Sequence, residues 1–60
     1  MWDDISVGDT LNVYVDVDGE EISVQGKITK IKSTYLMMKR IDGAPVFIER
    51  NDVIKIEIQI

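Results

Sequence analysis

The final stretch of the chain alternates strictly between apolar and polar side chains. Its isoleucines are Ile54, Ile56, Ile58 and Ile60, with one polar residue between each and the next. A period of two places alternate side chains on opposite faces of an extended strand, so the run predicts a strand with one apolar face. An apolar run at residues 46–48 precedes it, separated by the polar residues 49–52. The sequence therefore predicts two short strands joined by a tight polar turn.

Earlier parts of the chain show the same short strand pattern, divided by turn residues. Residues 11–17 alternate, and Asp18-Gly19 after them is a hairpin signal because glycine tolerates a positive φ. A second strand continues from residue 22. Its alternation slips after Ile28, which together with Gly26 predicts a sharply bent or bulged strand. Three further strands are expected, over residues 35–41, 46–49 and 53–60.

Five short strands with one bent member favour a sheet that curls onto itself. Helical periodicity is absent, apart from candidate single turns near residues 2–6 and 50–52. A flat sheet of this size leaves its edges open, whereas closure into a barrel removes most of them. We therefore expect one all-β domain over residues 1–60: a small five-stranded antiparallel barrel, SH3-like or Sm-like, with a short N-terminal lead-in.

Composition narrows the chemistry available to this chain. It contains no Cys and no His, which removes disulfides, the common soft-metal ligand sets and the usual nucleophile or neutral-pH base. The acidic segment 16–21 predicts a hairpin turn, because an EF-hand loop needs twelve residues and flanking helices. We expect no enzyme, no cofactor and no metal. A domain of sixty residues has a marginal core, so we expect either oligomerisation or an unusually regular core.

The sequence also bears on location. No run approaches the roughly 20 apolar residues that a membrane-spanning helix needs. The first residues are acidic, whereas a signal peptide opens with basic ones. The expected location is the cytoplasm, or the host cytoplasm if a phage encodes the chain, with no membrane partner.

Charge is segregated along the chain, whose net charge is −4. Residues 1–26 hold seven acidic side chains and no basic one, and residues 27–40 hold five basic side chains and no acidic one. Overall acidity disfavours non-specific binding to phosphate backbones. The favoured interpretation is that adjacent strands pair their opposite charges across the sheet. The other is a basic strip that binds nucleic acid, whose candidates are Lys30, Lys32, Lys39, Arg40 and Arg50.

Aromatic and Met residues on outward faces indicate a protein interface. If residues 11, 13, 15 and 17 face the core, Tyr14 points outward, and by the same alternation so does Phe47. In the third strand Arg40 favours the set that contains Met38 as the outer one. Trp2 lies in a segment with no strand partner. Such side chains are typical of interfaces, although they could instead plug the barrel ends. The candidate interface residues are Phe47, Tyr14, Trp2 and Met38.

Residues 47–56, Phe-Ile-Glu-Arg-Asn-Asp-Val-Ile-Lys-Ile, resemble the second motif of the Sm/Lsm family, which includes the bacterial Hfq-type proteins. That motif has an apolar pair, an Arg-Gly-Asn-like turn and an alternating β-branched strand. Residues 13–19 and 26–28 are similar to the first motif of the same family. The resemblance covers residues 10–58 and extends to related SH3-like small barrels of bacteria and phages. It implies the same barrel and, for an Sm-like protein, an RNA-binding ring in which strands four and five of neighbouring subunits pair.

Together these observations predict a non-catalytic protein-binding module. It would occupy the surface of a partner protein of unknown identity, as a homo-oligomer. Small size, acidity and missing catalytic groups suit a phage-type inhibitor or adaptor. The alternative from the family resemblance is an Sm-like RNA-binding ring protein, and a third is a structural subunit of a larger assembly.

Overall fold

The computed structural model describes residues 2–59 and contains five strands and two single turns of 3-10 helix. The strands are β1 (Thr10–Val17), β2 (Glu20–Ile31), β3 (Tyr35–Lys39), β4 (Pro45–Glu49) and β5 (Val53–Gln59), and the turns are η1 (Trp2–Asp4) and η2 (Arg50–Asp52). All paired strands are antiparallel, which confirms the predicted all-β class. Ile60, the last isoleucine of the alternation, lies outside the described residues. Between residues 2 and 59 no helix is long and apolar enough to cross a membrane.

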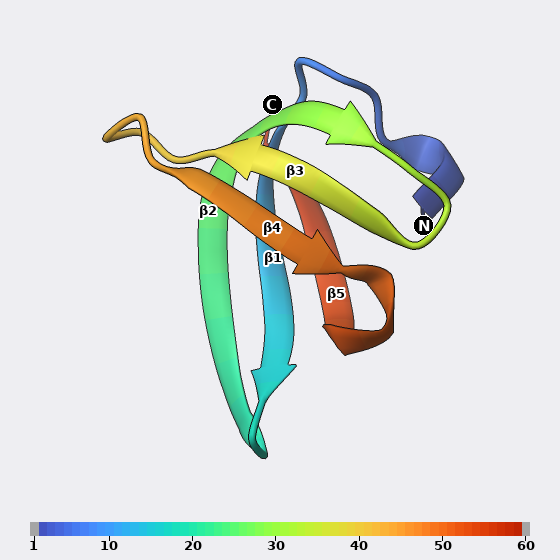
Figure 1. The fold of residues 1–60 in the computed structure, drawn as a ribbon, viewed down its shortest axis with the longest axis vertical. Coiled ribbons are helices and arrows are strands. Elements are labelled where there is room, and N and C mark those ends of the chain that lie inside the picture. Colours follow the sequence, from blue (N-terminus) through green and yellow to red (C-terminus); the bar gives the residue numbers. More distant parts are fainter. Residues whose placement is uncertain (1, 60) are drawn as a thin grey trace.

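The five strands form one curled sheet in the order β4-β3-β2-β1-β5. Figure 1 shows β3 and β4 crossing the long β1–β2 hairpin, with η2 at the corner between β4 and β5. The number, direction and curl of the strands agree with the expected fold. The sheet is not closed into a barrel, however, because β4 and β5 each pair with one strand only and remain its two edges within residues 2–59.

Strand β2 bends because its two halves pair with different strands. Residues 20–27 pair with β1, and residues 27–31 pair with β3. The register shifts between Ile28 and Lys30, as a bulge does. At Gly26 the end of β3 comes so close that a Cβ would lie 2.8 Å from the carbonyl oxygen of Lys39. The bent or bulged second strand that the sequence predicts is confirmed.

The core lies on the concave face of the sheet. Its buried residues come from every strand except β5 and also from the lead-in: Trp2, Ile5, Leu11, Val13, Val15, Ile28, Leu36, Met38 and Ile48. Val53 and Ile56 of β5 pack against them while staying partly exposed. Trp2 is only 7% exposed, and its indole Nε1 donates to the carbonyl of Lys32 at 3.0 Å. The lead-in therefore seals one end of the core. Trp2 is not an exposed interface residue, and its burial agrees with the alternative that such side chains plug an end of the fold.

The inner and outer faces of β3 are the reverse of the prediction. Leu36 and Met38 are 0% and 1% exposed. They lie opposite core residues of the neighbouring strands, Ile48 on β4 and Ile28 on β2. Arg40 misled the prediction because β3 ends at Lys39, so Arg40 belongs to the following loop and its polarity says nothing about the strand's faces. Met38 is thus a core residue.

The isoleucines of β5 are also arranged differently from the prediction, which placed them all on one face of the strand. The register against β1 shifts between Tyr14 and Val15, so that Val53 lies opposite Val15 and Ile56 lies opposite Val13. Ile54 falls at this irregularity and is 50% exposed. The described isoleucines of β5 therefore do not share one buried face, because a bulge reverses the orientation of the residues beyond it.

Candidate functional site

The outer face of β3 and β4 carries three neighbouring side chains that we call the aromatic patch: Tyr35, Met37 and Phe47. Met37 lies directly opposite Phe47. The rings of Tyr35 and Phe47 stack with their centroids 4.9 Å apart and their planes at 27°. Since Leu36 and Ile48 point into the core, their neighbours along each strand must point outward. Phe47 is 54% exposed, although it is the largest apolar side chain of β4.

This patch lies beside an open edge of the sheet. Strand β4 pairs with β3 and with no other strand among the described residues, so its second edge presents unpaired main-chain groups. Pro45 at its start has no N–H to donate, but the following residues keep theirs. An edge of this kind pairs readily with an added strand. The patch and the edge together offer apolar contact and main-chain hydrogen bonds in one place.

The structure does not gather the candidate interface residues into one surface. Phe47 points outward as predicted. Tyr14 is also on the outer face, but it lies on β1, which β2 and β3 separate from β4. Trp2 and Met38 are buried. Sequence reasoning missed Tyr35 and Met37, which alternation would have placed beside Phe47 if the third strand had been ended before Arg40.

Tyr14 is held within its own sheet by polar contacts. Its hydroxyl donates to Glu57 Oε1 at 2.7 Å and accepts from Asn12 Nδ2 at 3.1 Å. The ammonium of Lys55 lies 5.3 Å from the ring centroid and 3.5 Å from Glu57 Oε2. The hydrogen bond to Glu57 raises the pKa of Tyr14 above its ordinary value, and burial adds to this. The same bond, followed by the charge of Lys55, lowers the pKa of Glu57.

Replacing Tyr14 with phenylalanine is expected to raise the pKa of Glu57 toward its ordinary value. A carboxylate whose pKa is lower in the folded chain stabilises the fold above the unfolded pKa, and this contribution is lost as pH falls through the folded value. The Tyr14→Phe protein should therefore be less sensitive to acid over that range. An NMR titration of the Glu57 carboxyl carbon measures the shift. Tyr35→Phe is the control, and an unchanged Glu57 pKa in Tyr14→Phe would show that the bond does not form.

Like charges face each other across the strands, so the predicted pairing of opposite charges is wrong at these positions. Asp16 lies opposite Glu21 in the β1–β2 hairpin, and Lys27 lies opposite Lys39 between β2 and β3. Like charges in such positions destabilise a sheet. The reason is the order of the strands along the chain. The β1–β2 hairpin joins two acidic segments, and the β2–β3 connection joins two basic segments. The molecule thus has an acidic hairpin tip and a basic region near the bend of β2.

The candidate nucleic-acid residues divide into two groups. Lys30, opposite Met37, and Lys39 point to the outer face, and Lys32 is exposed after β2. Arg40 pairs with Asp42 at 3.4 Å within the β3–β4 loop. Arg50 lies 5.2 Å from the Trp2 ring and donates to the carbonyl of Ser33 at 3.2 Å. The two arginines are therefore engaged in local contacts, whereas Lys30 and Lys39 lie on the face that also holds the aromatic patch.

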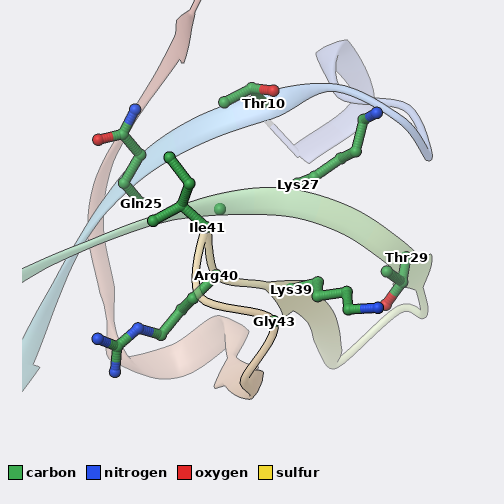
Figure 2. Close-up of a pocket in the computed structure, with 9 residues that line it drawn as sticks. Thr10, Gln25, Lys27, Thr29, Lys39, Arg40, Ile41 and Gly43 are labelled. Atoms are coloured by element: carbon green, nitrogen blue, oxygen red, sulfur yellow. The ribbon is translucent and has the colours of Figure 1, made fainter.

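An open groove of about 480 Å³ lies where β2 bends away from the end of β3. Its charged lining residues are all basic: Lys27, Lys39 and Arg40. Figure 2 shows the side chain of Ile41 reaching over β2 toward Gln25, while Lys39 extends toward Thr29. Gly26 is part of the lining. The groove is thus a basic hollow beside an apolar side chain.

No protein-family model matches the chain, and no curated protein matches it. The function is therefore inferred from the fold and surface: an open antiparallel sheet with an aromatic patch beside one edge and a basic groove at its bend.

Proposed function

We propose that this chain is a non-catalytic protein-binding module that occupies the surface of a partner protein and assembles as a homo-oligomer. The observation that carries the proposal is the aromatic patch beside the free edge of β4. Phe47 is 54% exposed there and is stacked on Tyr35. Aromatic and Met side chains are enriched among the residues that dominate protein interfaces.

Binding would combine two contributions at the β4 edge. An extended segment of the partner adds to β4 through main-chain hydrogen bonds, which supply affinity with little demand on sequence. Its outward side chains then meet Phe47 and Met37, which supply specificity. The stack between Tyr35 and Phe47 holds the aromatic side chain in place before binding, so that less side-chain entropy is lost.

The setting that suits such a module is the cytoplasm of a cell whose proteins it regulates. A chain of sixty residues with net charge −4 and neither Cys nor His is well suited to act by covering a surface. These properties suit a small inhibitor or adaptor of the kind that phages direct at host proteins, and we extend the proposal to that class of protein.

Replacing Phe47 with aspartate is expected to weaken partner binding at least about thirtyfold, the effect of losing a residue worth 2 kcal/mol or more at an interface. The fold should survive, because Phe47 is not in the core. Affinity capture from the native host with the unchanged chain, followed by mass spectrometry, identifies the partner, and calorimetry then gives both affinities.

Val7→Asp is the matched control, since Val7 is 63% exposed and lies in the lead-in rather than on β4. Circular dichroism verifies that both variants are folded. If Phe47→Asp binds the identified partner as tightly as Val7→Asp does, the aromatic patch is not the binding surface.

A second candidate function is an Sm-like RNA-binding ring. The observation that favours it is the presence of Lys30 and Lys39 on the same outer face as Tyr35, whose ring offers a stacking surface for a base. The free edges of β4 and β5 would pair between subunits of the ring. Salt-dependent binding to oligo-U or oligo-A that falls in a Lys30→Ala/Lys39→Ala chain supports this function. Absence of binding at low salt excludes it.

A further inference from the structure

The first half of β2 has a free edge of its own. Strand β2 is 12 residues long, whereas β3 is only 5 residues long and begins to pair with it at Lys27. Residues 20–26 therefore pair with β1 on one side and, within the described part of the chain, with no strand on the other, although the end of β3 lies close to Gly26. We call residues 20–26 the free β2 segment. Like any sheet edge, it presents unpaired N–H and C=O groups in the geometry that another strand fits.

An apolar groove runs along this free segment. It is lined by Ile22, Val24, Ile41 and Val46 together with three polar residues, Ser23, Gln25 and Arg40. Ile22 is 41% exposed and Ile41 is 105% exposed. Ile22 and Val24 lie opposite the core residues Val15 and Val13 of β1, so they are on the concave face, which is the face that holds the core. The edge thus combines free main-chain groups with apolar side chains that lack full cover.

The charges at the two ends of the free segment are opposite. Glu20 and Glu21 stand at its start, and Lys27 follows its end, beside Lys39 and Arg40 of the basic groove. Within the chain these groups face like charges: Glu21 faces Asp16, and Lys27 faces Lys39. An antiparallel neighbour with the same sequence would bring each acidic end to a basic end. The charge pattern therefore favours a second copy of this chain over an unrelated strand.

We propose that the free β2 segment pairs antiparallel with the free β2 segment of a second copy, forming a two-fold symmetric dimer with a continuous sheet. This rests on the proposed homo-oligomer and names its interface. The midpoint of residues 20 and 26 is residue 23, so Ser23 lies at the two-fold axis opposite its own copy. Ile22 then lies opposite Val24 of the second copy, which places apolar side chains together on the concave face.

The same register brings the charges together on the outer face. Glu21 lies opposite Gln25 of the second copy and diagonal to its Lys27, a separation of roughly 7–8 Å between Cα atoms that long side chains span. The two-fold symmetry forms the same Glu21–Lys27 contact a second time, as isologous dimers require. Lys27, whose own neighbour across the strands is Lys39, thereby gains a nearby carboxylate from the second copy.

Site-directed cross-linking tests the register directly. The chain has no Cys, so Ser23→Cys introduces the only thiol. Opposite residues in antiparallel strands have Cα atoms about 4.5–5.5 Å apart, within the range that a disulfide spans. Mild oxidation should convert most Ser23→Cys chains into covalent dimers. Ser33→Cys, in the exposed turn between β2 and β3, sets the background. Equal and slow cross-linking of both variants overturns the proposal.

A charge exchange tests the complementarity. Glu20→Lys/Glu21→Lys and Lys27→Glu/Lys39→Glu each bring like charges together in a homodimer, so each variant alone should be monomeric by light scattering at low salt. An equimolar mixture should restore the dimer, because the reversed ends of one variant match those of the other. The unchanged dimer should weaken as salt rises. Circular dichroism establishes that both variants are folded.

Two results contradict the proposal: a monomeric unchanged chain at millimolar concentration, or an oligomer that both charge variants retain. The second result would assign assembly to the β4 and β5 edges instead. The protein-binding proposal is tested independently of the dimer, because Phe47 lies on β4, outside the free β2 segment. Phe47→Asp should leave the dimer intact while it loses the partner, and a chain that fails to dimerise can still show Phe47-dependent binding.

Discussion

Replacing Leu36 with alanine is expected to destabilise the folded chain by about 2–5 kcal/mol, the usual cost of a cavity left by a buried leucine. Leu36 is 0% exposed and lies between Ile31 of β2 and Ile48 of β4. A domain of this size has a total stability of roughly 3–9 kcal/mol. The substitution therefore removes a large part of the stability, and urea unfolding followed by circular dichroism measures it.

Met37→Ala is the matched control, because Met37 is the next residue of β3 and points to the opposite face. It is half-buried on the outer face, and its loss should cost less than about 1 kcal/mol. The comparison tests the faces of β3 directly. A larger loss in Met37→Ala would mean that the strand is oriented the other way, and equal losses would contradict a β3 with only one face in the core.

The faces of β3 are also where sequence reasoning was least informative. Residues 35–38 are all apolar or aromatic, so alternation alone does not distinguish the two sets. The prediction depended on placing Arg40 within the strand. Its N–H donates to the carbonyl of Ala44 at 2.9 Å, and this bond closes the β3–β4 loop, so the strand ends at Lys39, two residues earlier than predicted.

Features that depend on local backbone chemistry were predictable. The hairpin at Asp18-Gly19 has φ of 52° and 85° at these two residues, as a tight turn between antiparallel strands requires. The carboxylate of Asp16 also accepts from the N–H of Gly19 at 3.0 Å. The sequence did not decide between an exposed and a buried Trp2, because its hydrogen-bond acceptor, the carbonyl of Lys32, lies 30 residues further along the chain.

The candidate site was predictable in part for the same reasons. The outward direction of Phe47 follows from the alternation around Ile48, a local feature. Its neighbours Tyr35 and Met37 depend on the faces of β3 and were therefore missed. The segregation of charge was visible in the sequence, but its meaning depended on register. Only the pairing of Asp16 with Glu21 and of Lys27 with Lys39 shows that like charges meet.

Gly26→Ala is expected to destabilise the fold by about 1–3 kcal/mol, the range for an atom forced into a packed site. The φ of Gly26 is not in the left-handed region, so the backbone itself tolerates alanine. Without a steric conflict, the substitution would stabilise the chain by about 0.4–1 kcal/mol through the entropy of the unfolded state. The sign of the change in unfolding free energy therefore tests the close approach of β3 to β2.

The conflict at Gly26 is with backbone, which is why it is not easily relieved. An added Cβ would lie 2.8 Å from the carbonyl oxygen of Lys39 and 3.2 Å from its carbonyl carbon. Relief requires the end of β3 to move away from the bend of β2, and Lys39 moves with it. Gln25→Ala, at the exposed neighbouring position, should change stability by less than about 0.5 kcal/mol. A stabilised Gly26→Ala chain would show that the two strands do not approach this closely, and it would remove the basis for placing Lys39 beside Lys27 at the end of the free β2 segment.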